Sequence, residues 1–129
     1  MRPVRNPLAS DMGRFKDKIN DWMQNGKIEI LDLDKIRGRS IQKCFVIVDE
    51  IQNLSASHAK AIATRAGEGT KMVFTGDFSA DQIDVPFLDE RSNGLSVMVA
   101  KMTGSPLFGT VYLDQAIRSA LTKEILERW

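Results

Sequence analysis

Two short apolar runs constrain the fold more than any other feature of the sequence. Residues 45–48 (FVIV) and 72–74 (MVF) carry apolar side chains at consecutive positions instead of alternating them with polar ones. Strands of this kind occur in parallel sheets, where helices cover both faces. The sequence therefore predicts a parallel α/β fold with both strand faces buried.

The spacing of apolar residues predicts the other elements. Helices are expected over residues 14–26, 55–67, 95–102 and 115–129, and Ser55 is the expected N-cap of the second. Strands are expected over residues 27–33, 43–50, 71–77 and 109–114. Pro3 and Pro7 predict that the first ten residues are extended or irregular. Strands and helices thus alternate, as they do in a mostly parallel sheet flanked by helices.

The bulk composition is that of a soluble globular protein. The 129 residues suit one domain, which we expect to span 1–129. A net charge of +1 gives no overall attraction to nucleic acid or acidic membranes. The sequence has no apolar run long enough to cross a bilayer and no secretory signal, and its single cysteine and single histidine argue against disulfides or structural zinc. A cytoplasmic protein is expected.

Acidic residues follow both central strands. Asp49 and Glu50 come directly after the first strand, and Gly76 and Asp77 end the second. Ligands of open parallel sheets bind at the carboxyl ends of the strands. If the two strands are neighbours, three carboxylates converge there and repel one another unless a cation or hydrogen-bond donors neutralise them. Magnesium, which prefers oxygen ligands, is the expected ion.

Apolar residues followed by Asp-Glu at a strand end form the Walker B pattern. In that pattern the Asp holds the magnesium that bridges nucleotide phosphates, and the Glu can deprotonate the attacking water. The pattern has an ordinary alternative, because strands often end in charged residues where the chain leaves the core. Gln52 and Gln82 strengthen the functional reading, since an amide can donate to phosphate and accept from water.

Four stretches together resemble the PhoH family of P-loop ATPases. They are IEILDLDKIRGRSIQKCFVIVDEIQNLS, TRAGEGTKMVFTGD, QIDVPFLDERSNGLS and IRSAL, in that order. The resemblance covers nearly the whole chain from Lys27 onward and is specific as a set. It implies a RecA-like P-loop NTPase core related to helicases, with ATP and Mg²⁺ as ligands. The family is linked to phosphate starvation.

The resemblance also implies roles for individual residues. Asp49 would hold magnesium through water, Glu50 would be the general base, and Gln52 belongs to a helicase-like DExQ pattern. Gly76, Asp77 and Gln82 resemble the helicase GDxxQ motif that senses the terminal phosphate, although the Gln comes later here. Arg118 matches the position of an arginine finger, and in the expected last helix it would share a face with Ile125, seven residues later. A homo-oligomeric ring and coupling to RNA are further implications.

One expected element is missing from the sequence. A phosphate-cradling loop needs GxxxxGK[ST], and no such motif occurs in residues 1–129. GEGTK at residues 67–71 runs from a helix into a strand, the reverse of a P-loop, and is read as a turn. The chain is therefore expected to be the C-terminal portion of a PhoH-like domain, truncated before or within the first βα unit, or a version of the domain with pieces missing. Whether it hydrolyses ATP by itself is left open.

Two other functions fit parts of the pattern. A metal-dependent nuclease could use Asp49, Glu50 and Asp77 as a carboxylate cluster, but would leave Gln52, Gln82 and Arg118 without roles. A non-catalytic module that binds RNA or a protein partner could keep the fold while binding ATP weakly.

Overall fold

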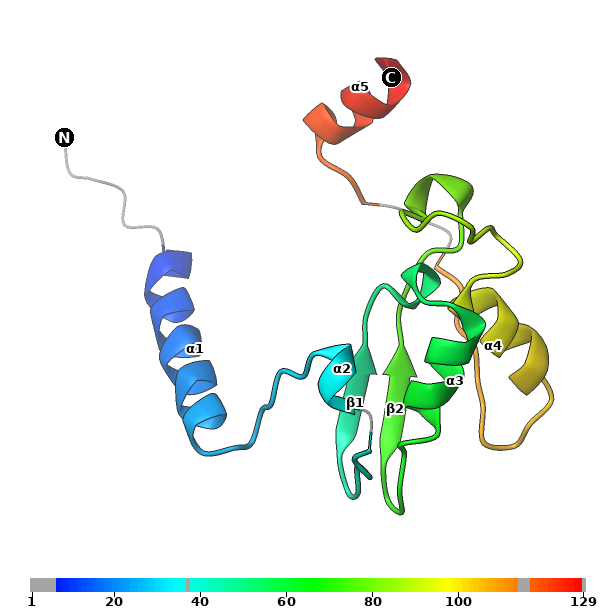
Figure 1. The fold of residues 1–129 in the computed structure, drawn as a ribbon. Coiled ribbons are helices and arrows are strands. Elements are labelled where there is room, and N and C mark those ends of the chain that lie inside the picture. The colour runs from blue at the N-terminus through cyan, green and yellow to red at the C-terminus, as the bar shows by residue number, and fades with distance from the viewer. Residues whose placement is uncertain (1–6, 37, 114–116, 129) are drawn as a thin grey trace.

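The computed structural model describes residues 7–36, 38–113 and 117–128. Its helices are α1 (Pro7–Gln24), α2 (Leu33–Ile36), α3 (Ala56–Ala63), α4 (Gly94–Met102) and α5 (Ala120–Arg128). Its strands are β1 (Phe45–Val48) and β2 (Lys71–Phe74), and two 3-10 turns are η1 (Ile51–Asn53) and η2 (Ala80–Gln82). Figure 1 shows α2, α3 and α4 grouped around the two strands, with α1 and α5 set apart.

Strands β1 and β2 are parallel neighbours, as the apolar runs predicted. Val46 pairs with Met72 and Val48 with Phe74. Helix α3 makes the connection between the strands, which a parallel pair requires because a tight turn cannot join them. The prediction of a parallel α/β fold is confirmed, with a sheet of two strands in the described part of the chain.

The core lies on one face of the sheet. Val48 of β1 is buried against Ile36 of α2 and Ile62 of α3. Further apolar side chains pack around these three: Leu31, Val46, Leu54, Met72 and Phe74. The strand register places the side chains of Val46, Val48, Met72 and Phe74 on this same face.

The opposite face of β1 is open, so the expectation that both faces are buried is wrong. Phe45 and Ile47 alternate with the core residues and are 65% and 63% exposed. Within residues 7–36, 38–113 and 117–128, no element covers these two side chains. Consecutive apolar residues allow both faces of a strand to be buried, but in the described part of the chain other elements cover only one face of β1.

Two capping side chains fix α3 and α4 to each other. Ser55 caps α3 by accepting a hydrogen bond from the backbone N–H of His58, as predicted. Asn93, which is fully buried, caps α4 by accepting from Ser96 N at 2.9 Å. The backbones of Ser55 and Asn93 form an antiparallel bridge, so the two helices begin side by side.

Two predictions about the N-terminal region are wrong. Residues 7–10 are helical, because α1 begins at Pro7, where the first turn does not need the missing N–H. Residues 27–33 form no strand: Lys27–Asp32 are irregular, and Leu33 begins α2. Ile30 in this segment is 76% exposed, and an apolar run without a neighbouring strand has no ladder to join.

Two predictions about the C-terminal region are also wrong. Residues 109–113 are irregular where a strand was expected, and Val111 is 85% exposed. The last helix begins at Ala120 instead of 115, so Arg118 precedes it. The predicted sharing of a helix face by Arg118 and Ile125 therefore does not occur. Residues 114–116 and Trp129 lie outside the described residues.

Helix α1 keeps an uncovered apolar stripe. Its exposed apolar side chains recur on one side of the helix: Met12, Phe15, Ile19 and Met23. Charged residues lie between them in the sequence of α1: Arg14, Lys16, Asp17, Lys18 and Asp21. Among the helices that the structure describes, none has both the length and the apolar character needed to cross a membrane.

We expect Gly94→Ala to destabilise the contact between α3 and α4. A Cβ at position 94 would lie 2.8 Å from the Cβ of Ala59 and 2.9 Å from the carbonyl oxygen of Leu54. Overpacking of this kind lowers the free energy of unfolding by about 1–3 kcal/mol, measurable by urea denaturation. Gly13→Ala is the control, because a Cβ there meets nothing within 4 Å. Equal urea midpoints for the two variants would contradict the prediction.

Candidate functional site

The candidate site lies where β1 and β2 end side by side. The strand pairing continues past both strands, since Thr75 N donates to Val48 O at 2.9 Å and Ile51 N donates to Thr75 O at 3.1 Å. Asp49 therefore lies next to Thr75, whose hydroxyl donates to the Asp49 carboxylate. The same carboxylate accepts from Glu50 N at 3.1 Å. Two donors thus orient Asp49 while it stays exposed to solvent.

Asp49 and Thr75 offer oxygen ligands of the kind that Mg²⁺ prefers. One carboxylate and one hydroxyl, both open to solvent, leave room for the waters that Mg²⁺ usually keeps. The donor set therefore fits a magnesium ion bound largely through water. It would not hold a metal by protein ligands alone.

The expected convergence of three carboxylates is wrong. No three His, Cys, Asp or Glu side chains in the described part of the chain lie close enough to hold one metal together. Local hydrogen bonds explain this, because the Glu50 carboxylate is bonded to Gln52 and the Asp77 carboxylate to Ser79. The nuclease alternative depended on such a cluster, and nothing in this geometry favours it.

Glu50 has an unusual backbone conformation. Its φ of 54° and ψ of 39° lie in the left-handed region, which costs a residue with a side chain about 1–2 kcal/mol. Strained conformations of this kind concentrate at functional sites. The Glu50 carboxylate accepts a hydrogen bond from Gln52 Nε2 at 2.5 Å, and the residue as a whole is exposed. A fixed carboxylate next to Asp49 could accept a proton from a bound water.

Gln52 is buried beneath the site and is only 1% exposed. Besides Glu50, its Nε2 donates to the carbonyl oxygen of Gln82 at 3.1 Å. Its Oε1 accepts from Asp77 N at 3.3 Å. Gly76 allows this approach, because a Cβ at that position would overlap the Gln52 amide.

Asp77 is held in its ionised form. Its carboxylate accepts from Ser79 Oγ at 2.5 Å and from Ser79 N at 2.9 Å, and these bonds hold the pKa of Asp77 below its usual value. The positive charge of Arg118 lowers that pKa further. Arg118 therefore lies within electrostatic reach of Asp77, although it is not on a helix.

The structure brings most of the predicted site residues to this edge. Asp49, Glu50, Gln52, Gly76 and Asp77 are linked by the contacts above. Gln82 joins them through its backbone, whereas its side-chain amide donates to the Asp81 carboxylate at 3.2 Å. The rings of Phe78 and Tyr112 pack edge to face with centroids 6.3 Å apart, which brings Tyr112 next to the loop after β2.

Sequence reasoning missed three supporting residues. Thr75 orients Asp49, Ser79 binds Asp77, and Asn53 Oδ1 accepts from Asp84 N at 2.9 Å. The strand register would have indicated Thr75, because it places this residue beside Asp49. The spacing of Asp77 and Ser79 is that of an Asx turn. Asn53 had no comparable sequence signal.

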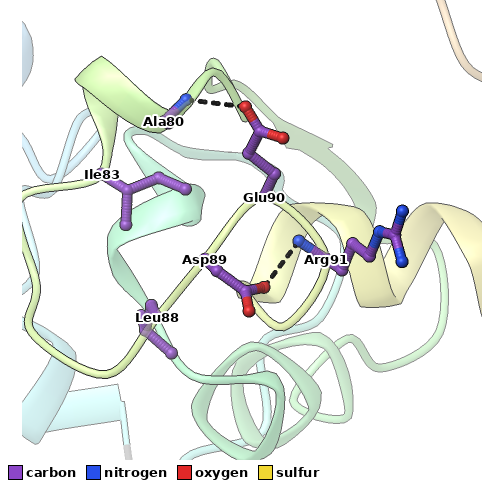
Figure 2. A pocket seen from close by; sticks show the side chains of 6 residues that line it. All are labelled: Ala80, Ile83, Leu88, Asp89, Glu90 and Arg91. Atoms are coloured by element: carbon purple, nitrogen blue, oxygen red, sulfur yellow. Dashed lines mark hydrogen bonds between the residues drawn. The ribbon is translucent and has the colours of Figure 1, made fainter.

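A separate open pocket lies in the loop between β2 and α4 (Figure 2). It is lined by Ala80, Ile83, Leu88, Asp89, Glu90 and Arg91. Its carboxylates are engaged locally: Glu90 accepts from Ala80 N at 3.3 Å and Asp89 from Arg91 N at 2.8 Å (Figure 2). None of the predicted site residues lines this pocket, which is therefore distinct from the strand-end site.

Comparison with known proteins identifies similar chains. A family model described as PhoH-like protein matches residues 1–129. Protein PhoH2 of Bacillus subtilis (strain 168) is 45% identical over 94% of the chain, and the match covers 32% of that relative. A PhoH-like protein of Synechocystis sp. is 37% identical over 98% of the chain, and another of Bacillus subtilis is 35% identical over 100%. Each of these two matches covers 39% of the relative.

The chain thus spans about a third of the length of the curated relatives it matches, from 32% to 39%. The alignment with the PhoH2 protein runs over 145 residues, which is more than the 129 residues of the chain. That relative therefore carries internal residues that are missing here.

We expect Ser79→Ala to raise the pKa of Asp77 toward its ordinary value, because it removes the Ser79 hydroxyl bond, the largest cause of the depression, while the bond from Ser79 N and the charge of Arg118 remain. A folded-state pKa below the unfolded one stabilises the protein above the unfolded pKa, and this stability is lost as pH falls through the folded pKa. The variant should therefore lose stability at neutral pH and differ little from the parent in acid.

Carboxyl ¹³C NMR titration and urea denaturation at two pH values would measure these effects. The pKa of Asp89 serves as an internal control, because its depression comes from Ser92 and Arg91 and should not change. An unchanged Asp77 titration in the variant would contradict the assignment.

Proposed function

The chain belongs to the PhoH family, and from this membership we propose that it forms part of a P-loop NTPase site that binds and hydrolyses ATP with Mg²⁺. The proposal places the nucleotide at the edge where β1 and β2 end. The observation that carries it is the parallel pairing that sets Asp49 beside Thr75 with its carboxylate exposed.

Asp49 would hold magnesium through water, with the Thr75 hydroxyl orienting its carboxylate. When bound, the ion would neutralise charge on the phosphates and bring them to this edge. Glu50, the next residue, would accept a proton from the attacking water. Its left-handed backbone and its bond to Gln52 support this role, because they fix the carboxylate beside Asp49.

Gln82 and Arg118 would contact the terminal phosphate. The charge of Arg118 already acts on Asp77 at this edge, which suits a cation that stabilises negative charge on a transferring phosphate. The Gln82 amide is bonded to Asp81, so it would have to exchange that bond for one to phosphate. Gly76 and Asp77 would form the turn that leads from β2 into the loop containing Gln82.

Residues 1–129 contain no GxxxxGK[ST] loop, and the chain spans about a third of its relatives. The proposal for this chain therefore concerns the metal, the attacking water and the terminal phosphate, and does not assign residues to a phosphate-cradling loop. RNA coupling, a homo-oligomeric ring, a cytoplasmic location and a single domain over 1–129 stay predictions from the sequence and the family. The non-catalytic binding module is the alternative that the following experiments address.

We expect Asp49→Asn to weaken magnesium-dependent ATP binding about 10–100-fold, the usual cost of losing an outer-shell metal partner. Isothermal titration calorimetry with ATP, with and without Mg²⁺, measures the effect. Asp32→Asn is the matched control, because Asp32 is an exposed acid paired with Lys35. A folded protein that shows no Mg²⁺-dependent ATP binding would contradict the proposal and favour the non-catalytic module.

We expect Glu50→Gln to lower the kcat of ATP hydrolysis about 10²–10⁴-fold, because the amide cannot accept the proton from water. The Kd for Mg²⁺ and ATP should stay close to that of the parent, since Glu50 is not the proposed metal ligand. Phosphate release by the full protein, measured beside calorimetry, separates the two effects. Unchanged turnover would exclude Glu50 as the base.

A further inference from the structure

We propose that Gln52 is a positioning residue that couples the orientation of the Glu50 carboxylate to the loop carrying Asp77 and Gln82. The family resemblance placed Gln52 among the residues that bind nucleotide, but at 1% exposure it has no free surface for a ligand. The role of Gln52 in ATP hydrolysis rests on the proposed function. The coupling between Glu50 and the loop rests only on the contacts of the nucleotide-free protein.

The Gln52 amide uses its full set of donors. An amide nitrogen has two protons to donate, and here one goes to Glu50 and the other to the Gln82 carbonyl. The amide oxygen accepts from Asp77 N. One side chain therefore bonds the proposed base and two points of the loop after β2.

The coupling follows from this shared nitrogen. A shift of the Gln82 backbone changes the position or the bonds of the same Nε2 that holds Glu50. The amide has little freedom to adjust, because Gln52 is almost fully buried and η1 is anchored by fully buried Ile51. Movement of the loop, for instance when Gln82 turns toward a phosphate, would thus reach the Glu50 carboxylate.

A purely structural role for Gln52 is the competing explanation, and Asn53 helps to separate the two. Asn53 also ties η1 to the loop, through Asp84 N, but its side chain has no bond to Glu50. Loss of the Asn53 contact should loosen the loop without removing the donor to Glu50. Asn53→Ala is therefore the matched control for changes at Gln52.

The first experiment uses NMR on the nucleotide-free protein. The two side-chain amide protons of Gln52 are hydrogen-bonded and buried. They should therefore exchange with solvent at least about tenfold more slowly than the side-chain amide protons of exposed Gln24. Glu50→Ala should speed the exchange of the Gln52 side-chain amide and, through the loosened bond to Gln52 Oε1, also that of the backbone amide of Asp77. Equal exchange at Gln52 and Gln24, or no response to Glu50→Ala, would overturn the coupling.

The second experiment compares ATP turnover in Gln52→Glu and Asn53→Ala. Gln52→Glu keeps the size and the acceptor for Asp77 N, but loses both donors and sets a like charge beside Glu50. We expect its kcat to fall about 100-fold, as displaced catalytic groups do, with an unchanged Kd for Mg²⁺ and ATP. Asn53→Ala loosens the loop but keeps the donor to Glu50, so we expect its loss of kcat to be at least about tenfold smaller than that of Gln52→Glu.

The outcomes separate the two proposals. Equal loss of kcat in Gln52→Glu and Asn53→Ala, or a change in KM alone, would overturn the positioning role in catalysis. If the parent protein binds no ATP with Mg²⁺, the proposed function fails, and the exchange experiment still decides whether Gln52 couples Glu50 to the loop.

Discussion

The hydrogen-bonded register between β1 and β2 determines where every other part of the site lies. It puts Val48 into the core and, one residue later, sets Asp49 beside Thr75. A slip of one residue would reverse the faces of the strand, expose Val48 and separate Asp49 from Thr75. The same pairing fixes the start of η1, because Ile51 N donates to Thr75 O. Core packing and site geometry therefore depend on a single alignment of two short strands.

Buried polar side chains hold this structure together alongside its apolar core. Its buried apolar residues are few, and one face of β1 exposes Phe45 and Ile47. The largest fully buried side chains include two amides, Gln52 and Asn93. Neither is left unsatisfied, as burial of polar groups requires. These two amides fix the ends of the loop that joins β2 to α4, so the site is shaped by directional bonds as well as by packing.

The sequence predicted the parts of the molecule that local patterns encode. Consecutive apolar residues predicted β1 and β2, and a serine before an apolar helix predicted the cap at Ser55. The strand predicted at 27–33 did not form, and residues 109–113 of the other predicted strand are irregular, because an apolar run does not specify a partner strand. The burial of Gln52 could not be predicted either, since it depends on how Gly76 and the loop come together in space. The acids at the edge were predicted, but the bonds that keep them apart were not.

The energies at Glu50 show why its orientation depends on one neighbour. The left-handed backbone costs about 1–2 kcal/mol for a residue with a side chain. A hydrogen bond to a charged group contributes about 1.5–3 kcal/mol, so the bond from Gln52 is of the size needed to offset that cost. Because the backbone cost and the hydrogen-bond contribution are of similar magnitude, the net free-energy preference for this conformation of Glu50 is small. A modest displacement of Gln52 could then release the Glu50 carboxylate, which makes the amide a natural point of control between the loop after β2 and the residue that follows Asp49.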